Sequence, residues 1–249
     1  QGNQPGRAGG QCDRMLMLLG VIGAVSGALI VGAIWGLYGK FRARTEGVIV
    51  AIAGGALLLS IVLELVQPAI EKSSMITAVI GVLAGAALFA VVDYLIDEKW
   101  GSQSGGGMLA AVTLDGIPEN LALGVALIGA GATEAAALAG SILLSNLPEA
   151  ASGARSMREN QNFPRLRILG IWSGTAVILS AAALFGNSFL APLNSDMLAF
   201  ISCLAAGAVT ASLTTEVLPK AHEQARHWAG FATAIGLLLA LLLHSLGNG

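Results

Sequence analysis

The feature that most constrains this sequence is a succession of eight apolar stretches. They fall near residues 15–38, 47–69, 74–96, 107–130, 134–154, 167–186, 196–219 and 228–246. An α-helix needs about 20 apolar residues to cross roughly 30 Å of hydrocarbon. An open sheet would leave unpaired backbone groups in lipid. The sequence therefore predicts an all-α, polytopic membrane protein with eight transmembrane helices.

Composition agrees with this fold class and excludes others. Hydrophobic residues make up 55% of the 249 residues and charged residues only 11%, which is far from the usual composition of a soluble domain. A net charge of −2 excludes a basic nucleic-acid-binding surface. Cys12 and Cys203 are too far apart in sequence to indicate a disulfide framework or a thiolate zinc site. The Gly- and Gln-rich residues 1–14 predict a disordered tail, which leaves 15–249 as one transmembrane domain.

The distribution of Lys and Arg predicts the orientation of the helices. The odd-numbered connections hold ten of these residues: Lys40, Arg42, Arg44, Lys99, Arg155, Arg158, Arg165, Arg167, Lys220 and Arg226. The N-terminal tail and the even-numbered connections hold three: Arg7, Arg14 and Lys72. Because basic residues are retained on the cytoplasmic side, we expect both termini outside, in the extracellular or periplasmic space. The expected location is the inner (plasma) membrane.

Carboxyl groups interrupt the two central apolar segments. Asp115 and Glu119 lie four residues apart in the fourth segment, and thus on one face of a helix. The fifth segment has a polar stripe at helical spacing, formed by Ser141, Ser145, Glu149 and Ser152. A charged side chain at the centre of a bilayer costs about 2.5–3.5 kcal/mol, so it usually faces a partner or a cavity. We expect these two polar faces to lie against each other.

A proline precedes a glutamate in each central segment, in "DGIPENLALG" and "SNLPEAAS". Pro118 and Pro148 have no N–H to donate, so the carbonyls of Leu114 and Leu144 lose their helical partners. Carboxylates, hydroxyls, the amide of Asn146 and free carbonyls would together form an oxygen-rich cage for a cation. Interrupted helices in matching positions are also typical of a transporter's substrate site. The alternative is a purely structural role, in which each proline makes a kink and the carboxyl groups are protonated and hydrogen-bonded between helices.

Two outer segments carry a second matching pattern. "ELVQPAIE" begins at Glu64 and "EVLPKAHE" at Glu216, and each has a proline three or four residues on and a second Glu at seven. Their opposite orientations predict inverted repeats of helices 1–3 and 6–8 around the central pair. Glu64, Ser141 and Ser152 are then candidates for an entrance or pathway. The alternative for Glu64 and Glu216 is an interfacial, snorkelling carboxylate. His244 is predicted to serve packing or the interface.

These motifs resemble the ZIP (Zrt-, Irt-like) family of divalent metal transporters, particularly its bacterial members. "DGIPENLALGV" is similar to the family's HNxPEG motif and "SNLPEAASG" to its second xxxPEG motif. "AAGAVTASLTTEVLPKAHE" and "GGALLLSIVLELVQPAIE" complete the resemblance. It implies a homodimer and two adjacent metal positions. The first would be formed by Asp115, Glu119, Ser145 and Glu149, and the second by Asn146, both glutamates and Glu216.

The chain departs from the family's pattern at its metal-binding motif. Asp115 stands where the family has a histidine, and Gly116 where it has an asparagine. The remaining ligands are all oxygen atoms, which suit Mg²⁺, Mn²⁺ and Ca²⁺, whereas imidazole suits Zn²⁺ and Fe²⁺. Two interpretations therefore stay open: a shift toward hard cations such as Mn²⁺ or Mg²⁺, or retained use of Zn²⁺ or Fe²⁺ through Asp115.

The sequence thus predicts transport of a divalent metal cation into the cytoplasm and no enzymatic activity, because neither a P-loop nor a catalytic-triad pattern is present. One alternative is a non-transporting membrane protein whose degenerate metal site is sensory or structural. A weaker alternative is an intramembrane aspartyl protease built on Asp93, Asp97 or Asp115. That chemistry needs two aspartates on separate helices, and the second central helix offers Glu149 instead.

Overall fold

The computed structural model describes residues 6–39, 42–100, 105–128, 136–159 and 162–247, and every secondary-structure element in them is helical. The all-α prediction is confirmed. In chain order the elements are α1 (Gly6–Tyr38), α2 (Ala43–Ser60), the π-helix η1 (Ile61–Val66), α3 (Gln67–Lys72), α4 (Met75–Trp100), α5 (Gly105–Ala126), α6 (Ala136–Glu159), α7 (Arg165–Phe189), α8 (Ser195–Ser212), the π-helix η2 (Leu213–Val217), α9 (Leu218–Ala225) and α10 (His227–Gly247).

Six helical stretches of the described chain are long and apolar enough to cross a membrane. They are α1, the continuous α2–η1–α3, α4, α7, the continuous α8–η2–α9, and α10. The stretches α5 and α6 are not among them; α6 includes Glu149, Arg155, Arg158 and Glu159. Large apolar side chains such as Ile76, Leu83 and Leu166 are exposed, as contact with lipid requires. These features support a multi-pass membrane protein.

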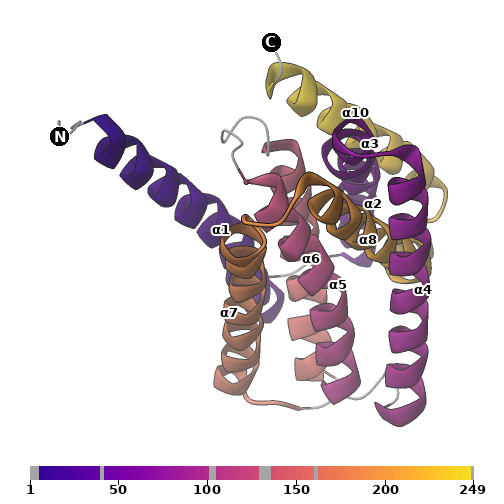
Figure 1. Ribbon diagram of the computed structural model, residues 1–249. Helices are drawn as coiled ribbons and strands as arrows, with labels where there is room; N and C mark the ends of the chain where they lie inside the picture. The colour runs from indigo at the N-terminus through magenta and orange to yellow at the C-terminus, as the bar shows by residue number, and fades with distance from the viewer. Residues whose placement is uncertain (1–5, 40–41, 101–104, 129–135, 160–161, 248–249) are drawn as a thin grey trace.

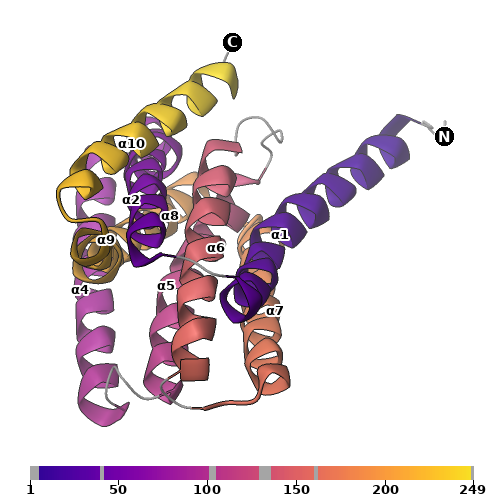
Figure 2. The same cartoon turned by 180° about the vertical axis from the view of Figure 1, so that it is seen from behind.

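The helices α5 and α6 occupy the middle of the molecule, with α1 and α7 on one side and α4 on the other (Figures 1 and 2). The helix α1 packs on α6 and α7, and α5 packs on α7 and α8. The helix α2 packs on α10, and α4 packs on α8. Both ends of the chain lie toward one end of the molecule, and the connection from α6 to α7 lies at the opposite end (Figure 1). The central position of α5 and α6 brings their carboxyl groups into the protein interior.

Glycines allow the backbones of α2 and α10 to approach closely. A β-carbon at Gly55 would collide with the carbonyl of Thr233, and one at Gly236 would collide with the carbonyl of Ile52. Small residues at helix crossings are typical of membrane proteins, in which van der Waals packing drives helix association. The crossing of α4 on α8 uses the same reciprocal contact, made by Val82, Gly85, Leu204 and Gly207.

The two π-helices stand directly before prolines. The helix η1 contains Glu64 and ends two residues before Pro68, and η2 contains Glu216 and ends two residues before Pro219. A proline cannot donate the backbone N–H that the preceding turn would accept. A wider π turn accommodates this loss, and π-helices are frequent at functional sites. The sequence predicted the glutamates and prolines but not the π turns.

The first helix is longer than its apolar stretch. It begins at Gly6, so it extends into the tail that the sequence predicts as disordered over residues 1–14. Adding residues to an existing helix costs less than nucleating a new one, which explains the extension. Residues 1–5 and 129–135 lie outside the described chain.

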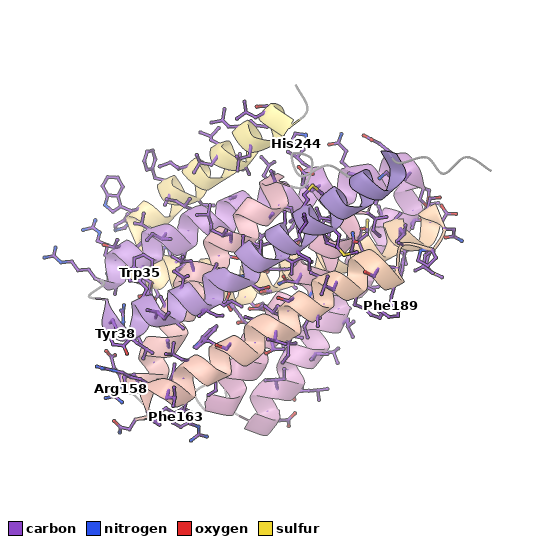
Figure 3. The ribbon with its side chains drawn as sticks, turned by 90° about the vertical axis from the view of Figure 1, so that its left-hand side faces the viewer. Trp35, Tyr38, Arg158, Phe163, Phe189 and His244 are labelled. Atoms are coloured by element: carbon purple, nitrogen blue, oxygen red, sulfur yellow. The ribbon has the colours of Figure 1, made fainter. Side chains whose placement is uncertain are left out.

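Aromatic and basic side chains gather where the C-terminal end of α1 meets the N-terminal end of α7. Tyr38, Arg158 and Phe163 lie at this end, whereas Phe189 and His244 lie toward the other (Figure 3). The guanidinium of Arg165 lies 4.8 Å from the ring centroid of Tyr38. Such aromatic and basic groups are typical of the cytoplasmic membrane interface.

The crossing of α2 on α10 can be tested with two glycines of the same helix. We expect Gly236→Ala to destabilise the protein by about 1–3 kcal/mol, the usual cost of overpacking, because its methyl group would meet the Ile52 carbonyl. Gly230→Ala is the matched control, since a β-carbon there would have no neighbour within 4 Å. Thermal unfolding in detergent measures both variants. Equal melting temperatures would show that the crossing is not tight.

Candidate functional site

Three carboxyl groups of the central helices lie in the protein interior. Asp115 and Glu119 of α5 are buried, and Glu149 of α6 is half-buried. Pro118 and Pro148 each lie inside a continuous helix, so neither proline ends its helix. One missing backbone hydrogen bond is tolerated in a membrane helix when neighbouring groups compensate. Glu119 and Glu149 interact electrostatically between the two central helices; that the two whole polar faces lie against each other stays a prediction.

The end of α8 and η2 form the third wall of the site. The carboxyl of Asp115 is hydrogen-bonded to the side chains of Ser212 and Glu216. The Ser212 hydroxyl donates to Asp115, whereas a hydrogen bond between two carboxyl groups requires a proton on one of them. The other oxygens, Asp115 Oδ1 and Glu216 Oε1, are buried and accept no hydrogen bond. The pair thus has acceptor capacity directed into the interior.

Electrostatic interactions connect the remaining groups. Glu119 interacts with Glu149 and Asp115, and Glu149 interacts with Glu216 and with the cationic Lys220 of α9. Four acidic groups therefore share one region of the interior with one nearby ammonium group. Lys220 cannot balance all of these charges if they are ionised, so protons or a bound cation must supply the rest.

The other predicted ligands make contacts of their own. The Asn146 amide Nδ2 donates to the carbonyl of Val25 on α1 over 3.0 Å. The Ser145 hydroxyl donates to Ile142 of its own helix over 2.9 Å. The Ser141 hydroxyl bonds the Ser60 hydroxyl of α2 at 2.9 Å. Ser152 is half-buried on the same helix. Two members of the polar face of α6, Ser141 and Asn146, therefore bind neighbouring helices.

A preformed metal site is not present in the described part of the chain. No group of three or more His, Cys, Asp and Glu side chains there is arranged to hold a metal ion. Asp93 of α4 interacts electrostatically with Asp115, whereas the side chain of Asp97 lies outside the described residues.

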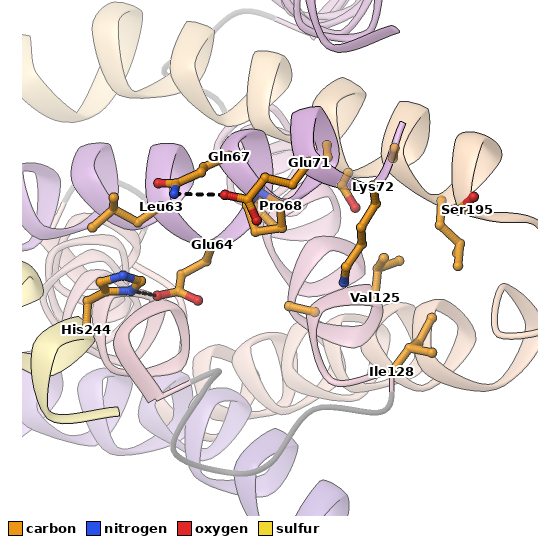
Figure 4. A pocket seen from close by; sticks show the side chains of 16 residues that line it. Leu63, Glu64, Gln67, Pro68, Glu71, Lys72, Val125, Ile128, Ser195 and His244 are labelled. Atoms are coloured by element: carbon orange, nitrogen blue, oxygen red, sulfur yellow. Dashed lines mark hydrogen bonds and ion pairs between the residues drawn. The ribbon is translucent and has the colours of Figure 1, made fainter. Parts of the chain in front are cut away.

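Glu64 lies away from these carboxyl groups, in a pocket of about 480 Å³. Its Oε1 is 2.7 Å from Nδ1 of His244 on α10, and Lys72 and Glu71 line the same pocket (Figure 4). The sequence predicted Glu64 as an entrance residue but assigned His244 to packing or the interface. His244 is instead the partner of Glu64, and only the packing of α10 against α2 reveals this.

A partly buried ion pair connects α6 with the beginning of α2. Arg155 Nη1 lies 3.2 Å from Glu46 Oε2, and the Gln224 amide of α9 reaches the other Glu46 oxygen at 3.5 Å. A buried charge is costly unless it has a partner of opposite charge. The sequence assigned Arg155 only to a cytoplasmic connection. Ser212 was also missed, although its position one turn before Glu216 was a readable signal.

Comparisons with known proteins add no assignment. No protein-family model matches the chain, and no curated protein matches it significantly.

The role of Asn146 can be separated from metal binding. We expect Asn146→Ala to destabilise the fold by about 1 kcal/mol, because the Val25 carbonyl loses its interhelical donor. Thermal unfolding in detergent, without added metal, measures the change. Ser152→Ala in the same helix is the control, because the Ser152 side chain is half-buried and makes no hydrogen bond to another helix within the described residues. If Asn146→Ala unfolds at the wild-type temperature, the hydrogen bond from Asn146 to Val25 does not stabilise the fold, and a role as a ligand would remain for this side chain.

Proposed function

We propose that this chain moves a divalent metal cation across the membrane, toward the cytoplasm, by alternating access, as its resemblance to the ZIP family implies. The observation that carries the proposal is the hydrogen-bonded pair of Asp115 and Glu216, with Glu119 and Glu149 in electrostatic range. Four interior carboxyl groups from three helical elements are costly for a fold. A cation that they exchange for protons gives a reason to keep them.

The chemistry of these groups favours a divalent cation. Carboxylate and hydroxyl oxygens are the ligands that hard divalent cations take. A cation that replaces the proton shared by Asp115 and Glu216 would bring two oxygens together, and Glu119 or Glu149 would supply the next ligand. Metal binding would then release protons, as expected for ligands that must be deprotonated. No step of this exchange requires hydrolysis.

Internal symmetry supports the finer architecture of eight spans with inverted repeats. Adding 152 to the residue numbers of Ile52, Gly55 and Glu64 gives Leu204, Gly207 and Glu216. Adding 151 to Val82 and Gly85 gives Thr233 and Gly236. The crossing of α2 on α10 is thereby related to that of α8 on α4, including which glycine meets which carbonyl.

The contacts of the central helices α5 and α6 are related by the same symmetry. Gly36 of α1 packs on the carbonyl of Ala151 in α6, and Gly186 of α7 packs on the carbonyl of Leu121 in α5. Ala151 and Leu121 each lie two residues after the glutamate of a Pro-Glu motif. Within the proposal α5 and α6 are therefore equivalent spans. Repeats of opposite orientation can exchange conformations, which is the basis of alternating access.

Contacts at the two ends suggest a direction for the path. The pocket with Glu64 and His244 would form an outer antechamber, and the Glu46–Arg155 ion pair would close the inner end. Transport would then require this ion pair to separate. The homodimer and the second metal position, with Asn146 as a ligand, rest on the family resemblance alone.

A second function is favoured by the loss of the motif histidine, in whose place Asp115 stands. In this alternative the chain does not transport, and the carboxyl cluster is a sensory or structural remnant. Uptake of Zn²⁺, Fe²⁺, Mn²⁺ and Mg²⁺ into proteoliposomes of the purified full chain distinguishes the two functions, because only the first gives protein-dependent accumulation inside the vesicles.

We expect Glu119→Gln and Glu149→Gln each to reduce uptake about 100-fold, the upper end of the effect of removing a group that supports a metal ligand. Glutamine keeps the volume and a polar group but removes the charge. Glu223→Gln on the exposed surface of α9 is the matched control and should keep wild-type uptake. Wild-type rates in either central variant, at equal reconstitution and equal thermal stability, would contradict transport through this cluster.

Selectivity is expected to depend on Asp115. Asp115→His places an imidazole one turn from Glu119, and imidazole favours Zn²⁺ over harder cations. We expect the ratio of Zn²⁺ to Mn²⁺ affinity to rise about tenfold, an order-of-magnitude estimate for one changed ligand. Competition of the two ions for binding to each protein measures the ratio. An unchanged ratio would mean that position 115 does not set selectivity.

A further inference from the structure

A surface groove runs between the first turns of α2 and α10, away from the carboxyl cluster. It has a volume of about 450 Å³, and its lining includes Arg44, Thr45, Val48, Trp228, Phe231 and Ile235. Trp228 and Phe231 form an edge-to-face pair with ring centroids 6.2 Å apart, and both are exposed. The groove therefore has an apolar floor, an aromatic rim and one cationic side chain.

The two helices begin side by side at this groove. The helices α2 and α10 pack together along their length, and Figure 2 shows them as neighbours. Arg42 precedes α2 and makes no side-chain cap, so the first N–H groups of that helix have no side-chain acceptor. Such groups and the helix dipole favour an anion at a helix N-terminus. Two parallel helices strengthen this preference at one place.

The charge at the groove is not neutralised by its neighbours. Glu46, the acidic residue of the first turn of α2, is buried and paired with Arg155. None of the ion pairs in the described residues involves Arg44. Arg42 and Arg226 are also exposed next to the starts of the two helices. Arg226 has a φ of 51°, an uncommon conformation for a residue other than glycine. The start of each helix is thus flanked by an exposed arginine.

We propose that this groove binds an anionic phospholipid of the cytoplasmic leaflet. The headgroup phosphate is held by Arg44 and the free N–H groups of α2, and an acyl chain lies over Val48 and Ile235 between the helices. Trp228 and Phe231 sit at headgroup level, where aromatic side chains concentrate. Basic pockets between membrane helices on the cytoplasmic side are suited to anionic headgroups. A protein partner would not require an acyl-sized apolar floor with an aromatic rim and one cationic side chain.

Trp228 provides a local probe that needs no metal. The full chain is reconstituted in vesicles of equal phosphatidylglycerol and phosphatidylcholine, with bromine on the acyl chains of one lipid at a time. Bromine quenches nearby tryptophan fluorescence. The same measurement on Trp228→Phe, which keeps an aromatic ring, removes the contribution of the other tryptophans. The quenching of Trp228 by each brominated lipid gives that lipid's apparent occupancy of the groove. We expect the occupancy by phosphatidylglycerol to be about five times that by phosphatidylcholine.

Arg44→Ala should abolish this preference, so that the ratio of the two occupancies falls to about one. Arg165→Ala should leave the ratio unchanged. Arg165 is the matched control because it is an exposed arginine in the first turn of α7, outside the groove. Equal quenching by both lipids in the wild type would overturn the proposal. So would an equal loss in the two arginine variants, because the preference would then reflect general surface charge. Failure of metal uptake would leave this result unaffected, since no cation is transported in the measurement.

Discussion

The close approach of helix backbones at glycines is the interaction on which the rest of this structure depends. Helices in lipid gain little from hydrophobic burial against each other, so contact area must come from short backbone separations. Gly55 and Gly236 provide it between α2 and α10, and Gly85 and Gly207 between α4 and α8. These crossings fix two outer pairs of helices. The helices α5 and α6 are thereby left in the middle, where their carboxyl groups must find partners.

The prolines and π turns shape the interior that these pairs enclose. The three elements of the central carboxyl cluster each depart locally from regular α-helical hydrogen bonding. The departures are Pro118 in α5, Pro148 in α6 and the π turn with Glu216 in η2. Such departures leave backbone oxygens without their usual donors and direct polar side chains inward. The hydrogen bond between the Asp115 and Glu216 side chains requires a proton on one of the two carboxyl groups. A proton-linked site is consistent with the proposed exchange for a cation.

Polar contacts at the periphery have a different character from those in the centre. The Glu64–His244 and Glu46–Arg155 pairs each join two helices that are distant in sequence, and each lies toward an end of the α2 stretch. The Glu46–Arg155 pair also leaves Arg44 as the available charge beside the α2–α10 groove. Pairing one acidic residue inside the protein thus determines the electrostatic character of the surface outside it.

The sequence by itself determined the helices and the residues that do not suit lipid. The apolar stretches coincide with the observed helices because backbone groups in hydrocarbon must bond within their own segment. Asp115, Glu119 and Glu149 could be identified as interior carboxyl groups because a charged side chain in an apolar segment is costly in lipid. Only the tertiary structure decided which groups meet. Glu216 bonds Asp115 from about 100 residues further along the chain, His244 pairs with Glu64, and the Asn146 amide donates to the Val25 carbonyl. Such partners depend on which helices cross and at what depth, and hydropathy and local spacing carry no information about either.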